Sequence, residues 1–218
     1  MRVVQPAGTL GSLKWMQKAV AQRPDLLQPE ALKPLEWVSP LASDGFAEYR
    51  DAGFLGRLGL GRLAPALAEF WPRRGPQWDG LATFPGGVVL AEAKAHLAEF
   101  DSPPSTARAA SAARIAAAFA SVQADLGLAP RRWDLRYYQY ANRIAHLWWL
   151  RRQGIDAHLL LIGFLGDDER GGPVDPAAWH AAHAGAEAEL GLVPNPLAPW
   201  VHTVCPDTRL LQECFRGP

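Results

Sequence analysis

A glutamate and a lysine lie two residues apart in a segment that is otherwise apolar, Gly87-Val88-Val89-Leu90-Ala91-Glu92-Ala93-Lys94-Ala95. Alternate side chains of a β-strand point to the same face, so Glu92 and Lys94 would share one face with Leu90. A charge buried there costs several kcal/mol unless it is paired or bound to metal. The chain has lysine only at positions 14, 18, 33 and 94. Lys94 in this strand therefore indicates a specific use, since lysine is a compact charge with a tunable pKa.

A carboxylate upstream, Asp79, is predicted to join that face. Residues 77–84 and 87–95 flank Pro85-Gly86, which predicts two antiparallel strands and a tight turn. A two-residue loop would place Asp79 opposite Glu92, and a four-residue loop would place it opposite Lys94. Either loop gathers the three side chains on one face, whereas an odd loop would not. We favour the four-residue loop, because Pro-Gly does not suit the primed turns of two-residue hairpins.

The expected grouping suits a divalent cation. Two carboxylates about 5 Å apart on neighbouring strands make a site for Mg²⁺ or Mn²⁺, with Asp79 and Glu92 as ligands. Such a metal lowers the pKa of a bound water that can attack a phosphate. Lys94 would then orient this water or stabilise charge that develops on the phosphate. The alternative is a plain Glu92–Lys94 contact within one strand, or a partly exposed edge strand.

Trp78-Asp79, followed at a spacing of thirteen by Glu92-Ala93-Lys94 on an apolar strand, resembles the PD-(D/E)xK nucleases. The resemblance covers about residues 44–166 and implies a restriction-endonuclease-like core. In that family the aspartate and the glutamate bind metal and the lysine serves the attacking water, which implies these roles for Asp79, Glu92 and Lys94. Trp78 stands where the family often has its eponymous proline.

The resemblance implies two further catalytic residues. Many members carry a glutamate on the helix before the strand pair; Glu48 is the candidate here, with Asp51 in reserve. The alternative for Glu48 is a solvated side chain paired with Arg50 or Lys33. Some exonuclease-like members carry a glutamine on the helix after the lysine, and Gln139 matches it.

Gln139 begins a polar stripe on that helix. Asn142, Arg143 and His146 follow it at helical spacing and would lie on the same side. Amide, guanidinium and imidazole groups suit contacts with phosphate and water, so we predict Asn142, Arg143 and His146 as substrate-binding residues. The alternative is a polar seam between packed helices.

The elements that must position these residues predict one α/β domain over residues 1–218. An N-terminal segment, 1–43, would hold a helix at about 11–22 and a proline-punctuated loop. The nuclease-like core, about 44–166, would contain the strand pair, an apolar strand at 157–166 and helices at 44–59, 62–70, 106–126 and 133–153. Residues 167–218 would add a helix at about 175–190 and a strand near 200–205. This order predicts a mixed central sheet flanked by helices on both faces.

Composition narrows the function classes. The chain has 218 residues, of which 49% are hydrophobic and 20% are charged, as is typical of an ordinary globular domain. A net charge of zero argues against a protein that coats nucleic acid, but it allows a small basic groove. Neither a signal peptide nor an apolar run of membrane length is visible, which predicts a cytoplasmic protein without a membrane partner. Cys205 and Cys214 fit no zinc motif and are expected as reduced thiols, with a disulfide as the alternative.

These observations predict a bacterial deoxyribonuclease that uses Mg²⁺ or Mn²⁺ to hydrolyse phosphodiester bonds through a metal-activated water. Its partner would be nucleic acid, specifically DNA, and a homodimer is left open. The alternative is a catalytically inactive protein with the nuclease fold that acts as a binding or assembly module. The zero net charge favours this alternative, whereas the Asp79, Glu92 and Lys94 set favours the enzyme.

Overall fold

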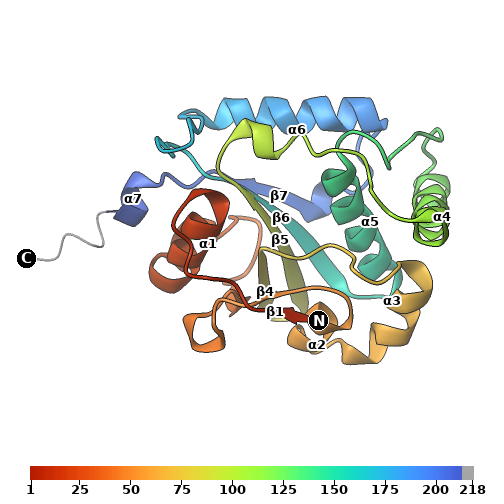
Figure 1. The fold of residues 1–218 in the computed structure, drawn as a ribbon, viewed down its shortest axis with the longest axis horizontal. Coiled ribbons are helices and arrows are strands. Elements are labelled where there is room, and N and C mark those ends of the chain that lie inside the picture. Colours follow the sequence, from red (N-terminus) through yellow and green to blue (C-terminus); the bar gives the residue numbers. More distant parts are fainter. Residues whose placement is uncertain (213–218) are drawn as a thin grey trace, which may run out of the picture.

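The computed structural model describes residues 1–212, and its centre is a five-stranded mixed sheet (Figure 1). In order across the sheet, the strands are β2 (Glu36–Ser39), β4 (Gly80–Phe84), β5 (Gly87–Lys94), β6 (Asp156–Gly163) and β7 (Val201–Val204). The β2–β4–β5 part is antiparallel and the β5–β6–β7 part is parallel. Strands β1 (Arg2–Val3) and β3 (Glu48–Tyr49) form a separate antiparallel pair. The prediction of an α/β fold with a mixed sheet is confirmed.

Helices pack on both faces of this sheet. One face is covered by α1 (Gly11–Gln22), and the other carries the longer helices α4 (Ala109–Asp125), α5 (Tyr138–Arg152) and α6 (Pro176–Leu190). Residues 1–212 also contain three short helices: α2 (Ala52–Arg57), α3 (Ala64–Phe70) and α7 (Arg209–Gln212). Single 3₁₀ turns lie at Pro24–Leu27, Ala42–Asp44, Gly61–Leu63, Leu97–Glu99 and Ala198–Trp200. Helix α1 has the predicted bounds, and α6 begins within a residue of its predicted start.

The alternation predicted for β5 is confirmed. Val89, Ala91 and Ala93 pack with Trp15 and Met16 of α1 in one hydrophobic cluster. Leu90 belongs to the other cluster, which contains the buried residues of α4, α5 and α6. Because strand side chains alternate, Glu92 and Lys94 lie on the α5 side with Leu90.

The hairpin that leads into β5 has a two-residue turn, so our preference for a four-residue loop was wrong. Phe84 pairs with Gly87, and the register continues to Gly80 opposite Ala91. Gly86 has φ 100°, the left-handed conformation that a type II turn requires after a proline. This register brings Asp79, which directly precedes β4, beside Glu92.

Two predictions for the N-terminal third were wrong. The proline-rich loop contains β2, which forms an edge of the main sheet. Residues 44–59 do not form one helix, because Gly45, Phe46 and Asp51 have positive φ angles that no right-handed helix accommodates. Glu48 consequently lies on strand β3 rather than on a helix.

No helix among residues 1–212 combines the length and the apolar character that a bilayer crossing requires. Cys205 is partly buried, and burial raises the pKa of its thiol to about 11. Cys214 lies outside the described residues, so the expectation for this pair of thiols stays a prediction.

Candidate functional site

A pocket of about 410 Å³ opens where β5 ends and α5 begins. Loop residues 74–77 and 103–106 contribute to its walls. Seven residues define what we term the acidic pocket: Glu48, Asp79, Glu92, Lys94, Gln139, Asn142 and Arg143. The structure therefore brings together every predicted site residue except His146.

Glu92 lies between two cations in this pocket. Lys94 donates to Glu92 Oε1 over 2.6 Å, and Arg143 Nε donates to Glu92 Oε2 over 2.6 Å. The guanidinium of Arg143 also lies 4.8 Å from the ring centroid of Trp78, within cation–π range. Glu92 and Arg143 are 7% and 6% exposed, which makes the pair a buried one. The Glu92–Lys94 contact considered as an alternative is thus present, and α5 extends it with a second cation.

Asp79 approaches the same group from the end of β4. Its Oδ2 accepts a hydrogen bond of 2.8 Å from the backbone N–H of Ala93, which fixes the carboxylate against β5. Burial and the negative charge of Glu92 raise the pKa of Asp79 to about 8, against the opposing charge of Lys94. Burial would also raise the pKa of Glu92, but the charges of Arg143 and Lys94 outweigh it and lower that pKa. The surroundings therefore favour the ionised form of Glu92 and oppose ionisation of Asp79.

Glu48 is buried at 6% exposure, so its interpretation as a solvated residue was wrong. Its Oε2 accepts hydrogen bonds from Gln77 Nε2 at 2.6 Å and Gln5 Nε2 at 2.9 Å. Burial raises the pKa of Glu48, although both glutamine amides favour its ionised form. The carboxyl group of Glu48 is therefore fixed by hydrogen bonds at the edge of the pocket. It lies on a strand, where we expected a helix.

The four polar residues predicted along one side of α5 do not all lie at the acidic pocket. Gln139 is exposed at the pocket, and Asn142 Oδ1 accepts from Arg143 Nη1 at 2.7 Å. His146 lies elsewhere: its ring contacts Trp71 and Trp78 at centroid distances of 4.8 and 6.1 Å. Burial lowers the pKa of His146 to about 3, so the ring is neutral. The structure thus separates His146 from the three residues with which it was predicted to act.

The donor set fits a hard cation with few protein ligands. Among residues 1–212, no group of three or more histidine, cysteine, aspartate and glutamate side chains is arranged to hold a metal ion. Mg²⁺, however, commonly takes only one or two carboxylates and completes its shell with waters and substrate phosphate oxygens. Asp79 and Glu92 supply two carboxylates in one open pocket, which meets that requirement.

Sequence reasoning missed two contributors to this site. Gln77 donates its amide to Glu48, and its backbone carbonyl accepts from Arg143 Nη2 at 2.9 Å, so it links β3 to α5. Arg74 lines the pocket from the same loop. The only available signal was their proximity in sequence to Trp78-Asp79.

No protein-family model, no curated protein and no solved structure matches this chain. What the acidic pocket does therefore has to be inferred from its own residues.

Proposed function

We propose that the protein is a nuclease that hydrolyses phosphodiester bonds of DNA with Mg²⁺ or Mn²⁺, on a restriction-endonuclease-like core. One observation carries the proposal: Asp79, Glu92 and Lys94 line one solvent-accessible pocket. The resemblance to the PD-(D/E)xK nucleases assigns chemistry to the same three residues. The antiparallel pair β4–β5 followed by the parallel strand β6 is compatible with the core of that family.

In this proposal the residues of the acidic pocket have different roles. Asp79 and Glu92 would hold the cation, which when bound supplies a Lewis acid for water activation and for phosphate charge. Lys94 sets an ammonium group beside Glu92, where it can hold the attacking water or stabilise charge on the phosphate oxygens. Gln139, exposed at the pocket, can donate its amide hydrogens to a phosphate oxygen.

A second candidate function has its own supporting observation. Both oxygens of Glu92 already accept hydrogen bonds from cationic side chains, Lys94 on one and Arg143 on the other. Such internal neutralisation favours a catalytically inactive protein that keeps the fold as a binding or assembly module. The two candidates differ in a direct measurement, because only the nuclease needs Mn²⁺ to bind at Asp79 and Glu92.

The test is cleavage of plasmid, linear and single-stranded DNA by the purified chain with Mn²⁺, Mg²⁺ or a chelator. Lys94→Ala should lower cleavage by about 100-fold or more, the usual effect of losing a positioned catalytic group. Its stability should change little, because Glu92 keeps its contact with Arg143. Lys33→Ala, at an exposed lysine of an N-terminal loop, is the matched control and should cleave normally.

Two results would count against the nuclease. The first is full cleavage by Lys94→Ala, which would remove the lysine from the mechanism. The second is the absence of cleavage by the unmodified chain together with no Mn²⁺ binding by calorimetry. That pair of results would leave the binding or assembly module as the better account of the pocket.

A further inference from the structure

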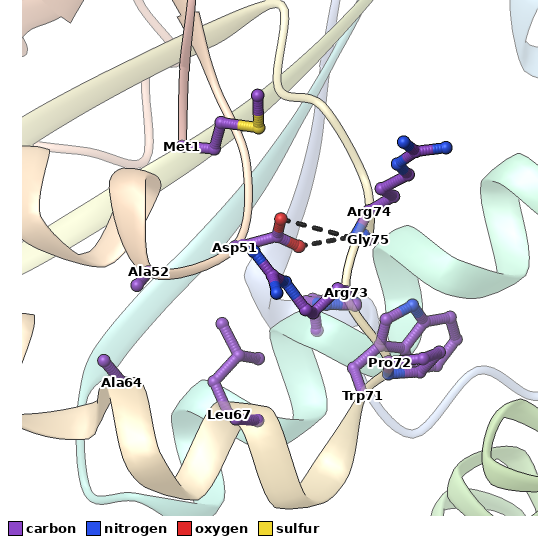
Figure 2. A pocket seen from close by; sticks show the side chains of 12 residues that line it. Met1, Asp51, Ala52, Ala64, Leu67, Trp71, Pro72, Arg73, Arg74 and Gly75 are labelled. Atoms are coloured by element: carbon purple, nitrogen blue, oxygen red, sulfur yellow. Dashed lines mark hydrogen bonds between the residues drawn. The ribbon is translucent and has the colours of Figure 1, made fainter. Parts of the chain in front are cut away.

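A second and larger pocket, of about 940 Å³, shares Arg74 and Gly75 with the acidic pocket and is drawn in Figure 2. Its lining includes Leu67, Trp71 and His146. Arg73 and Arg74 extend from the loop that borders it (Figure 2). Small-molecule sites typically measure about 300–1,000 Å³ and combine an apolar interior with a few polar groups. This pocket has both properties, and neither function considered above uses it.

The bordering loop is held in a strained conformation by Asp51. One carboxylate oxygen accepts from the backbone N–H of Gly75 at 2.9 Å and the other from that of Arg74 at 3.2 Å (Figure 2). Arg74 has φ 65°, which costs conformational energy for a residue with a Cβ. Such strain clusters at ligand-binding segments. The Asp51 contacts thus fix where Arg74 leaves the backbone, directly after Arg73.

The two arginines remain available for an anion. Both side chains are exposed, and neither forms an ion pair with any residue of the described chain. Arg136, in contrast, is paired with Asp101. Two arginines that follow each other in sequence at the edge of an apolar pocket suit an oxyanion such as phosphate, because each guanidinium offers several donors.

His146 adds a directional group to the lining. Its Nδ1 lies 2.8 Å from the carbonyl oxygen of Asn142, so in the neutral ring Nδ1 carries the proton and Nε2 is an acceptor. A hydrogen-bond acceptor in an apolar pocket favours a ligand whose ring carries an N–H donor. The exocyclic amino groups of adenine, cytosine and guanine are such donors.

We propose that this second pocket binds a single unpaired nucleotide, with its base among Leu67, Trp71 and His146 and its phosphate on Arg73 and Arg74. A nucleotide combines a planar ring bearing N–H donors with an adjacent anion, which is the combination that the lining residues recognise. The inference rests on the proposed function for the origin of that nucleotide, a DNA strand whose neighbouring phosphate reaches the acidic pocket. Arg74 and Gly75 line both pockets, so the two sites are adjacent along one loop.

The consequence is a preference for single-stranded DNA or for frayed ends. A base inside a duplex cannot enter a pocket without unpairing, which costs a few kcal/mol, whereas an unpaired base enters without this penalty. The proposal therefore specifies the substrate class more narrowly than the acidic pocket does.

The test is calorimetric binding of deoxyadenosine 5′-monophosphate to the full chain in the presence of a chelator. Ala68→Trp, which adds bulk from an exposed position lining the pocket, should weaken binding at least tenfold. Glu69→Trp, the exposed neighbour that does not line the pocket, should bind normally. Arg73→Ala should weaken binding about tenfold and reduce its salt dependence, whereas Arg62→Ala, an exposed arginine elsewhere, should not.

Two smaller probes separate the two halves of the ligand. Deoxyadenosine lacks the phosphate and ribose 5-phosphate lacks the base, so each should bind at least tenfold more weakly than the nucleotide. Equal binding of ribose 5-phosphate would overturn the base pocket and leave a simple anion site. No binding of the nucleotide, or unchanged binding by Ala68→Trp, would overturn the inference as a whole.

The failure of this inference can be told from the failure of the proposed function. Lys94→Ala, which disables the proposed nuclease, should keep full nucleotide affinity because Lys94 does not line this pocket. Nucleotide binding without DNA cleavage would therefore contradict the nuclease and support the pocket. Cleavage by a chain that does not bind the nucleotide would contradict the pocket and support the nuclease.

Discussion

The two faces of strand β5 differ in what they bury. Toward α1 the strand presents small apolar side chains, Val89, Ala91 and Ala93, all fully buried. Toward α5 it presents Leu90, then Glu92 and Lys94. The same backbone therefore carries a dry interface on one side and a charged one on the other.

The difference comes from the helix that covers each face. Helix α5 contributes Arg143 to the sheet, and this guanidinium reaches Glu92, which lies 51 positions earlier in the chain. Helix α1 instead packs Trp15 and Met16 on its side, while its Lys14 ammonium lies over the Trp15 ring and pairs with Glu169. A charge on β5 is thus stable only where the covering helix supplies a counter-charge.

The largest effect should follow from moving the charge to the wrong face. Ala91→Glu would place a carboxylate among the apolar side chains packed against Met16 and α1, on the face opposite Arg143. We expect a loss of about 4 kcal/mol in the free energy of unfolding, because an unpaired charge is buried. Urea denaturation would measure it, with Ala124→Glu at an exposed position of α4 as the control, expected to change stability by about 0.5 kcal/mol or less. A mild effect of Ala91→Glu would show that the two faces do not differ as argued.

A smaller loss of stability should follow from removing the counter-charge of Glu92 on the α5 side of the strand. Arg143→Met keeps apolar bulk near Trp78 but leaves Glu92 with Lys94 alone, and we expect a loss of about 3 kcal/mol. Replacing Glu92 as well, in Arg143→Met with Glu92→Met, should recover at least half of that loss, since no buried carboxylate remains. Chemical denaturation of both variants supplies the comparison. Equal stability of the single and double variants would mean that the ion pair, rather than the unpaired carboxylate, is what matters.

The sequence was sufficient to predict those features of β5 and of the covering helices that depend on local periodicity. The alternation along residues 87–95 assigned each side chain of β5 to its face, and the helix predicted at 11–22 has the bounds of α1. An even-length loop also predicted Asp79 on the same face as Glu92 and Lys94, although the favoured four-residue loop would have placed it opposite Lys94, and the observed two-residue turn places it beside Glu92.

The remaining parts depend on contacts that no local pattern records. Positive φ angles at Phe46 and Asp51 ended the expected helix and placed Glu48 on a strand. The Arg143–Glu92 pair joins elements far apart in sequence, so the helical stripe alone could not show whether Arg143 faces a carboxylate or a phosphate. His146 shares that stripe, yet the rings of Trp71 and Trp78 lie against it instead of the acidic pocket.

The smallest expected effect concerns His146, whose burial should make the free energy of unfolding depend on pH. His146 is 1% exposed, and its ring packs edge-on against Phe54, Phe70, Trp71 and Trp78. Burial lowers its pKa to about 3, with the charge of Arg143 acting in the same direction and the hydrogen bond to Asn142 opposing it. An unfolded histidine has a pKa of about 6.5.

Because the folded pKa is the lower one, the unfolded chain takes up a proton first as the pH falls below about 6.5, and folding stability is lost down to about pH 3. Between pH 7 and pH 5 this single group should remove about 2 kcal/mol from the free energy of unfolding. His146→Phe, an apolar ring among other rings, should flatten that part of the profile and leave the rest, including the contribution of His183, whose pKa burial lowers to about 4. Urea denaturation of both proteins at pH 5, 6 and 7 gives the difference directly. Parallel profiles for His146→Phe and the unmodified chain would show that His146 is protonated in the folded state, and so contradict its burial among the aromatic rings.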